Sequence, residues 1–178
     1  NDLNNAVVDK RYEDFFVWLE DNIQGLMRLH LLGGETFIQH DLITRVLDLV
    51  ERKPCPNLQL NIFSNFNPPQ KYFKKYINAI YELWKKGCIG RFDLTASIDC
   101  WGAHAEYVRF GLNCVEFEEN FAYAASFPEE FLFLSANQTV SSLTMKTMPD
   151  LIRMINKYNT NRHIVHYAML VDGNPFMR

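Results

Sequence analysis

The stretch that decides the fold is LQLNIFSNFNPPQKYFKKYINAIYELWKKGCIGRFDLTASID, residues 58–99. Residues 58–64 predict a buried strand, which the Asn and Pro residues at 65–69 end. Residues 70–86 repeat apolar side chains at helical spacing, and residues 91–99 predict another strand. Because strands joined through a helix run parallel, this stretch predicts one crossover unit of a parallel sheet.

The same alternation extends outward in both directions. Upstream, residues 11–21 and 42–50 predict helices on either side of a strand at residues 26–32, and Asp41 is expected to cap the second helix. The downstream elements are, in order, two helices, a strand, a helix and a strand, at residues 103–110, 117–126, 131–141, 148–158 and 163–171. The pattern is that of an α/β fold with helices covering a parallel sheet. Two architectures fit it: an open doubly wound sheet, or an α/β barrel that is complete or partial.

Composition narrows the class of protein. The 178 residues suggest a single domain over residues 1–178, and a hydrophobic share of 48% allows a sizeable core. With a net charge of -3 and no basic stripe, we expect no nucleic-acid partner. No stretch approaches the roughly 18–20 apolar residues of a membrane helix, so we expect no membrane partner and a cytoplasmic location. The four cysteines lack the spacing of a metal site and are expected to be free thiols.

Polar and small residues gather where the predicted strands end, which is where ligands of parallel α/β sheets bind. The first such end is Gly33-Gly34-Glu35. Two glycines leave backbone groups bare for a ligand, and Glu35 offers a carboxylate suited to an ammonium group. The alternative is a tight turn with a solvent-facing Glu.

A second group of candidates follows the strand at residues 91–99. By strand alternation Ser97 and Asp99 face the same side, where a hydroxyl and a carboxylate suit a ribose or an amino-acid group. Asp99 could instead cap the next helix. Arg109 is able to bind a ligand carboxylate through two N–H groups, and its alternative is a solvated surface position.

Four stretches, taken together and in order, resemble the radical S-adenosylmethionine superfamily, most closely its members with a C-terminal twitch domain. These stretches are LHLLGGETF (29–37), LNIFSN (60–65), RFDLTASIDCWGAHAEYVRFGL (91–112) and LSANQTVSSLTMKTMPDLI (134–152). The resemblance implies a partial, TIM-like (β/α) barrel of parallel strands. It also implies an enzyme that cleaves S-adenosylmethionine reductively at a [4Fe-4S] cluster, giving methionine and a 5′-deoxyadenosyl radical. A reductant such as flavodoxin or ferredoxin is the implied partner, and the substrate is not indicated.

The resemblance also implies roles for individual residues. Gly33, Gly34 and Glu35 would meet the methionine amino group of S-adenosylmethionine. Ser97 and Asp99 resemble a polar pair near its ribose and carboxylate, and Arg109 resembles a carboxylate-binding arginine. Weaker cofactor-binding candidates lie on the next strand, at Thr139 and Ser141.

The sequence departs from the family pattern at several positions. Thr36 stands where the family often has Pro, and Cys100 and Phe66 stand where it often has Gly. The largest departure is the CxxxCxxC loop that holds the cluster, because no cysteine precedes Cys55. We therefore expect residues 1–178 to be the central part of a barrel, incomplete at both ends and inactive alone. The first βα unit, the cluster ligands and the twitch extension would then lie outside this chain.

Two other functions remain open. The chain is alternatively a non-catalytic, degenerate barrel that acts as a binding or scaffold domain. A third hypothesis is an unrelated α/β enzyme that binds a small polar metabolite.

Overall fold

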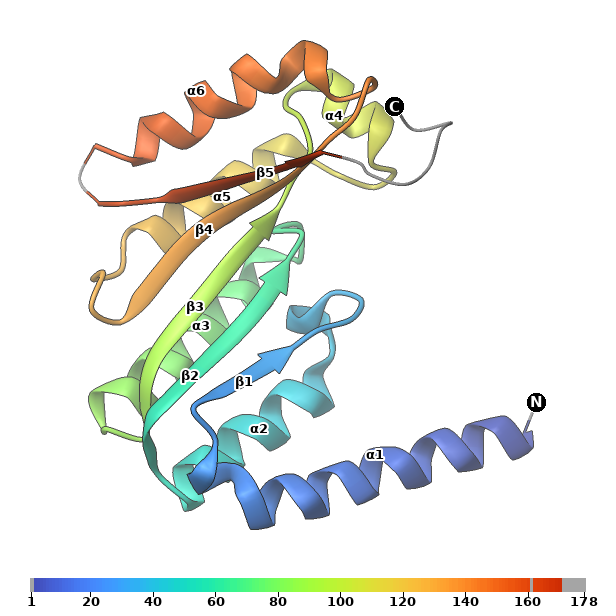
Figure 1. The fold of residues 1–178 in the computed structure, drawn as a ribbon, viewed down its shortest axis with the longest axis vertical. Helices are drawn as coiled ribbons and strands as arrows, with labels where there is room; N and C mark the ends of the chain where they lie inside the picture. The colour runs from blue at the N-terminus through green and yellow to red at the C-terminus, as the bar shows by residue number, and fades with distance from the viewer. Residues whose placement is uncertain (1, 161, 171–178) are drawn as a thin grey trace.

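Five parallel strands in chain order, β1-β2-β3-β4-β5, form the centre of the molecule (Figure 1). The computed structural model describes residues 2–160 and 162–170, with side chains from residue 10 onward. The strands are β1 (Arg28–Leu31), β2 (Cys55–Ser64), β3 (Ile89–Ser97), β4 (Leu132–Val140) and β5 (Val165–Leu170). The α/β class and the parallel sheet predicted from the sequence are confirmed.

Among the described residues, six helices and three short 3-10 turns connect and flank these strands. The helices are α1 (Asp2–Asn22), α2 (His40–Arg52), α3 (Gln70–Lys85), α4 (Ala103–Val108), α5 (Cys114–Ala125) and α6 (Met148–Tyr158). The 3-10 turns are η1 (Ile23–Gly25), η2 (Thr36–Ile38) and η3 (Met145–Thr147). In the part of the chain that the structure describes, none of these helices combines the length and apolarity needed to cross a membrane.

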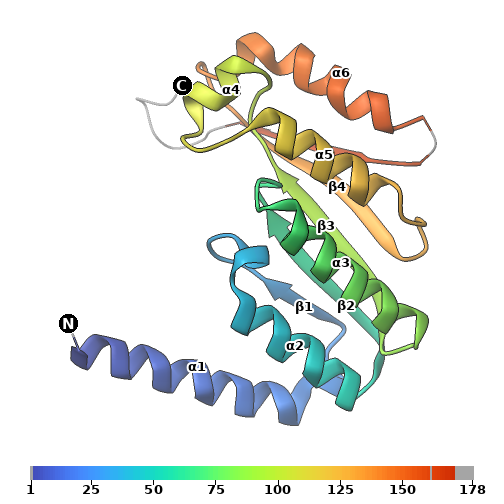
Figure 2. The ribbon, with the colours of Figure 1, turned by 180° about the vertical axis from the view of Figure 1, so that it is seen from behind.

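The helices α2, α3 and α5 cover one face of the sheet. They lie behind the strands in Figure 1 and in front of them in Figure 2. Alternate strand residues point toward them, and the row Leu29, Leu60, Phe92 and Leu132 shows how these side chains align across the sheet. All four are buried, so the core lies between the sheet and this helical layer.

The opposite face of the sheet carries the other half of the alternation. Its side chains are more polar and more exposed, and include Arg28, His30, Asn61 and Thr95. Within the described residues the strand order never reverses, whereas a doubly wound sheet needs such a reversal. The described part of the chain is therefore a parallel sheet with its strands in chain order and a layer of helices on one face, and it is not a doubly wound sheet.

Several predicted boundaries differ from those observed. The strand predicted over residues 58–64 begins earlier, because β2 starts at Cys55 and includes Pro56 at an irregularity in its pairing with β3. There the two backbones approach closely: a Cβ on Gly90 would lie 2.5 Å from the carbonyl oxygen of Pro56. The predicted helix cap at Asp41 is wrong, because Gln39 is the N-cap of α2. Residue 171 of the last predicted strand lies outside the described residues.

Candidate functional site

The Gly33-Gly34 turn leaves β1 in a backbone conformation that only glycine adopts at low cost. Its φ angles are +102° at Gly33 and +54° at Gly34. A Cβ on Gly34 would lie 2.9 Å from the side-chain nitrogen of Gln39, which donates a hydrogen bond to the carbonyl of Gly33. The turn therefore needs both glycines for its own geometry.

Glu35 turns its carboxylate inward, toward the end of β2. One carboxylate oxygen accepts hydrogen bonds from the Ser64 hydroxyl at 3.0 Å and the Phe37 amide at 3.2 Å. The other accepts from the Asn65 amide at 2.8 Å. Glu35 is only 9% exposed, so the alternative of a solvent-facing Glu is wrong.

This position changes the chemistry of the carboxyl group. Burial raises the pKa of Glu35, while the hydrogen bonds from Asn65, Phe37 and Ser64 act in the opposite direction. A carboxylate has about four lone-pair positions, and the three donors leave about one for a ligand. Glu35 therefore joins the ends of β1 and β2 and keeps limited capacity to bind another group.

Arg109 joins the second group of candidates. It directly follows α4, and its Nε donates to Asp99 Oδ2 at 2.7 Å. Its two terminal nitrogens donate to the carbonyl and the hydroxyl of Ser97, at 2.6 and 3.1 Å. Asp99 also accepts from the backbone N–H of Thr139, at 3.0 Å. Four of the predicted residues thus form one network across the ends of β3 and β4.

Both alternatives for this group are contradicted. The N-cap of α4 is Gly102, so Asp99 is not a helix cap. Arg109 is held by an ion pair in which its side chain is 29% exposed, so it is not a solvated surface residue. Ser141 reaches the network indirectly: its backbone N–H and its hydroxyl contact the Thr144 hydroxyl, which donates to the carbonyl of Thr139 at 3.2 Å.

Two asparagines that the sequence analysis did not select hold the same edge together. The side chain of Asn67 donates to the carbonyl of Gly111 at 2.7 Å and accepts from the amide of Asn113 at 2.9 Å. Asn120, which is fully buried, donates to the carbonyls of Phe66 and Pro68, both at 3.0 Å. In the sequence, Asn120 stands among the apolar residues of the helix predicted at residues 117–126. A polar residue at such a position could have indicated a buried side chain with hydrogen-bond partners.

A cavity of about 270 Å³ opens between the loop after β2 and the loop after α4. Its lining residues are Asn65, Asn67, Arg109, Phe110, Gly111 and Leu112. Glu35 borders it through the Asn65 amide, and Asp99 borders it through Arg109. The cavity therefore offers a guanidinium, two amides and an apolar wall, with two carboxylates behind them.

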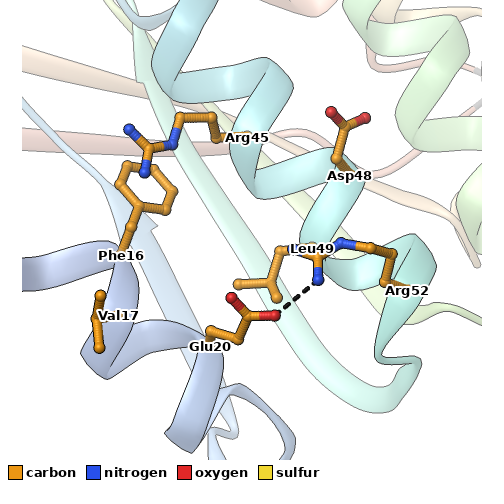
Figure 3. A pocket seen from close by; sticks show the side chains of 7 residues that line it. All are labelled: Phe16, Val17, Glu20, Arg45, Asp48, Leu49 and Arg52. Atoms are coloured by element: carbon orange, nitrogen blue, oxygen red, sulfur yellow. Dashed lines mark hydrogen bonds and ion pairs between the residues drawn. The ribbon is translucent and has the colours of Figure 1, made fainter. Parts of the chain in front are cut away.

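A second hollow, of about 250 Å³, lies between α1 and α2 and away from the strand ends (Figure 3). Its charged groups neutralise one another, since Arg52 pairs with Glu20 at 2.6 Å and Arg45 pairs with Glu13 at 2.6 Å. Arg45 also covers the Phe16 ring, with 3.9 Å from its guanidinium carbon to the ring centroid. These contacts join two helices. Asp48, which also lines the hollow, is exposed and forms no ion pair among the described residues.

The residues that line the cavity include no cysteine and no histidine. The four cysteines are free thiols as expected, with Cys55, Cys88 and Cys100 buried and Cys114 half-buried. Across residues 2–160 and 162–170, no three His, Cys, Asp or Glu side chains come together as metal ligands. No protein-family model and no curated protein matches the chain.

Proposed function

We propose that this chain is the core of a radical S-adenosylmethionine enzyme, and that its own part is to bind S-adenosylmethionine at the carboxyl edge of the sheet. The observation that carries the proposal is the clustering of the resemblance residues. Glu35 comes from the stretch at residues 29–37, and Asp99 and Arg109 come from the stretch at residues 91–112. Arg109 lines the cavity, Asp99 pairs with Arg109, and Glu35 bonds to the amide of Asn65, which also lines it.

The architecture supports the same proposal. A (β/α) barrel has parallel strands in chain order with helices on one face only, and the strands and helices described here have the same arrangement. Five such strands fit a partial barrel rather than a closed one of eight. Phe66 adds support, because it stands where the family often has Gly and has a φ of +56°, in the region that favours glycine.

Each group has a distinct part in the proposed complex. The bare backbone at Gly33 and Gly34 and the remaining lone pair of Glu35 receive the ammonium group of the ligand. Arg109 has five N–H donors, of which three are used within the chain, so two remain for the ligand carboxylate. Ser97 and Asp99 orient Arg109 and offer acceptors to ribose hydroxyls.

The cluster itself does not fit the residues described. Cys55 and Cys88 lie where β2 and β3 begin, at the end of the sheet opposite the cavity, and both are buried. A cluster would supply the electron that cleaves the bound ligand, with flavodoxin or ferredoxin as the reductant. Its ligands would come from outside residues 1–178, so no redox step is assigned to this chain, which we expect to be inactive alone.

The first test is binding of S-adenosylmethionine to this chain, measured by isothermal titration calorimetry. Arg109→Met removes the carboxylate partner and is expected to weaken binding roughly 10- to 100-fold, the effect of losing hydrogen bonds to a charged group. The matched control is Arg153→Met, an exposed arginine of α6 that pairs with Asp150 outside the cavity. No binding to the wild-type chain, or equal losses in both variants, contradicts the proposed site.

The second test separates the enzyme from the degenerate binding or scaffold barrel, which the missing CxxxCxxC loop favours. The chain is prepared with the segment that precedes it in its gene and reconstituted anaerobically with iron and sulfide. Formation of 5′-deoxyadenosine from S-adenosylmethionine and reductant supports the enzyme. Binding without a cluster or product supports the scaffold instead.

A further inference from the structure

Helix α1 has apolar side chains on two neighbouring sides. One side packs on the body of the molecule through Phe16 and Leu19, together with Ile23 directly after the helix. All three side chains are buried. The other side exposes Phe15 by 38% and Trp18 by 50%. Their rings lie nearly parallel, 6.3 Å apart, and form one aromatic surface.

The exposed side of α1 also carries charges of both signs. Arg11 lies about one helical turn before Phe15, and Asp21 lies about one turn after Trp18. Both are exposed, and in the part of the chain that the structure describes neither forms an ion pair. The acidic residues on the α2 side differ, since Glu13 and Glu20 are paired with Arg45 and Arg52.

The arrangement of this side is self-complementary. If two copies of α1 lie antiparallel, Phe15 of each copy meets Trp18 of the other. The same rotation brings Arg11 of each copy beside Asp21 of the other, so that positive meets negative at both ends. An interface of one surface with itself is what a two-fold dimer requires.

We propose that this side of α1 is a dimer interface, and that its occupant is the same side of a second copy of the chain. The interface consists of Arg11, Asp14, Phe15, Trp18, Asp21 and Asn22, all exposed. The helix lies at the edge of the molecule, and its N-terminal half extends past α2 (Figure 1).

A lipid surface fits this side less well. Helices that lie on membranes carry mostly Lys and Arg beside their apolar residues, whereas Asp14 and Asp21 here outnumber Arg11. The interface is small, so we expect a dissociation constant on the order of micromolar. The proposal does not depend on the ligand site, because α1 lies away from the strand ends.

The test is sedimentation equilibrium of the full chain over a range from low to several hundred micromolar. The wild type is expected to dimerise, and Trp18→Lys to remain monomeric. Val17→Lys is the matched control, because Val17 is 64% exposed but lines the hollow beside α2. Circular dichroism of each variant checks that α1 is still helical.

Charge reversal makes the test specific to the antiparallel geometry. Arg11→Glu and Asp21→Lys are each expected to weaken the dimer roughly tenfold, because each places like charges together at two symmetric positions. The two changes in one chain restore the wild-type affinity. A mixture of the two single variants does the same, as a heterodimer.

Three outcomes would overturn the proposal. A wild-type chain that is monomeric throughout the range has no such dimer. A dimer that survives Trp18→Lys uses another surface, such as the outer edge of β1. A monomer that binds phosphatidylserine-containing vesicles, and loses that binding in Trp18→Lys, has a lipid surface as the occupant.

Discussion

Phe66 brings two opposing effects to one residue. Its φ of +56° costs a non-glycine residue roughly 1–2 kcal/mol. Its ring is fully buried and packs against Phe73, Phe117 and Phe121, with centroid distances of 5.1 to 5.6 Å. Truncating such a ring costs about 3–5 kcal/mol, so packing outweighs the backbone cost.

The first prediction follows from that balance. Phe66→Ala loses the packing and keeps the unfavourable backbone, whereas Phe66→Gly loses the packing and removes the backbone cost. We expect both variants to be less stable than the wild type, with the glycine variant more stable than the alanine variant by roughly 0.5–1 kcal/mol. The measurement is the free energy of unfolding in urea.

Phe73 supplies the control, because it is also fully buried but lies in α3 with helical backbone. There the order reverses, and Phe73→Gly is expected to be less stable than Phe73→Ala by about 1 kcal/mol. The same order at both positions would mean that the backbone of Phe66 does not limit stability.

Glu35 gives the second prediction, through its raised pKa. The folded protein binds the Glu35 proton more tightly than the unfolded chain does. Stability therefore falls as the pH rises from the usual Glu pKa of about 4.3 to the raised value in the folded state. Glu35→Gln has no such proton, so the stability of the wild type relative to this variant is expected to fall across that window and then level off.

The measurement is the free energy of unfolding at a series of pH values. Glu116→Gln makes the same change at an exposed position of α5 and serves as the control. A wild type that gains stability over Glu35→Gln as the pH rises would show that the hydrogen bonds outweigh burial.

At the scale of elements, Arg162 fixes the end of α5. One terminal nitrogen donates to the carbonyls of Ala124, Ala125 and Phe127, at 3.3, 3.2 and 3.1 Å. The other donates to the carbonyl of Leu132, where β4 begins. A positive charge at a helix C-terminus is favourable, and here it also joins the helix to the strand that follows.

The third prediction is that Arg162→Met destabilises the protein by about 2–5 kcal/mol, because several buried carbonyls lose their donor. Arg162→Lys is expected to recover only part of this, since an ammonium group lacks the planar set of donors. The exposed Arg153→Met serves as control and is expected to change stability by less than about 0.5 kcal/mol. Chemical denaturation measures all three, and a small effect of Arg162→Met would refute the role of the charge.

The elements were more predictable than the contacts between them. The predicted helix at residues 148–158 coincides with α6. Its apolar residues recur at helical spacing within the segment itself, so the helix can be recognised without knowledge of the rest of the fold. The strand predicted at residues 26–32 is longer than the observed β1. The pairing of β1 with β2 stops at Leu31 and Ile62, although the apolar run continues to residue 32. Periodicity records which residues are buried, and pairing decides where a strand ends.

The candidate site was predictable in place but not in detail. Strand ends indicated where Glu35, Ser97 and Asp99 lie, because parallel strands bring their carboxyl ends to one edge. Their partners depend on loops, and no local pattern determines that Arg109 returns to Ser97 or that Asn67 reaches Gly111. Contacts between distant segments follow from the whole fold.

At the scale of the molecule, the fourth prediction concerns the difference between the central strands of the sheet and its edge strand β5. β3 is paired on both edges, whereas β5 is paired only with β4 in the described residues and is exposed from Tyr167 to Leu170. We expect amides of β2 and β3 to exchange with solvent only through global unfolding. Amides of β5 are expected to exchange through local opening that costs several kcal/mol less.

Native-state hydrogen exchange followed by NMR measures this difference for each amide. β4 is the internal comparison, because it has a strand on each side but lies next to the exposed edge. Equal protection in β3 and β5 would contradict the prediction and show that the sheet opens only as a unit.

The chain order of the strands has a consequence for how the protein is made. Each strand pairs with the next one along the chain, so paired residues such as Arg28 and Gln59, or Phe92 and Leu132, are separated by only 31 and 40 positions. No strand waits for a partner from the far end of the polypeptide. Because synthesis proceeds from the N-terminus, each of these strands leaves the ribosome after the strand with which it pairs, so the sheet can be assembled in the order of synthesis.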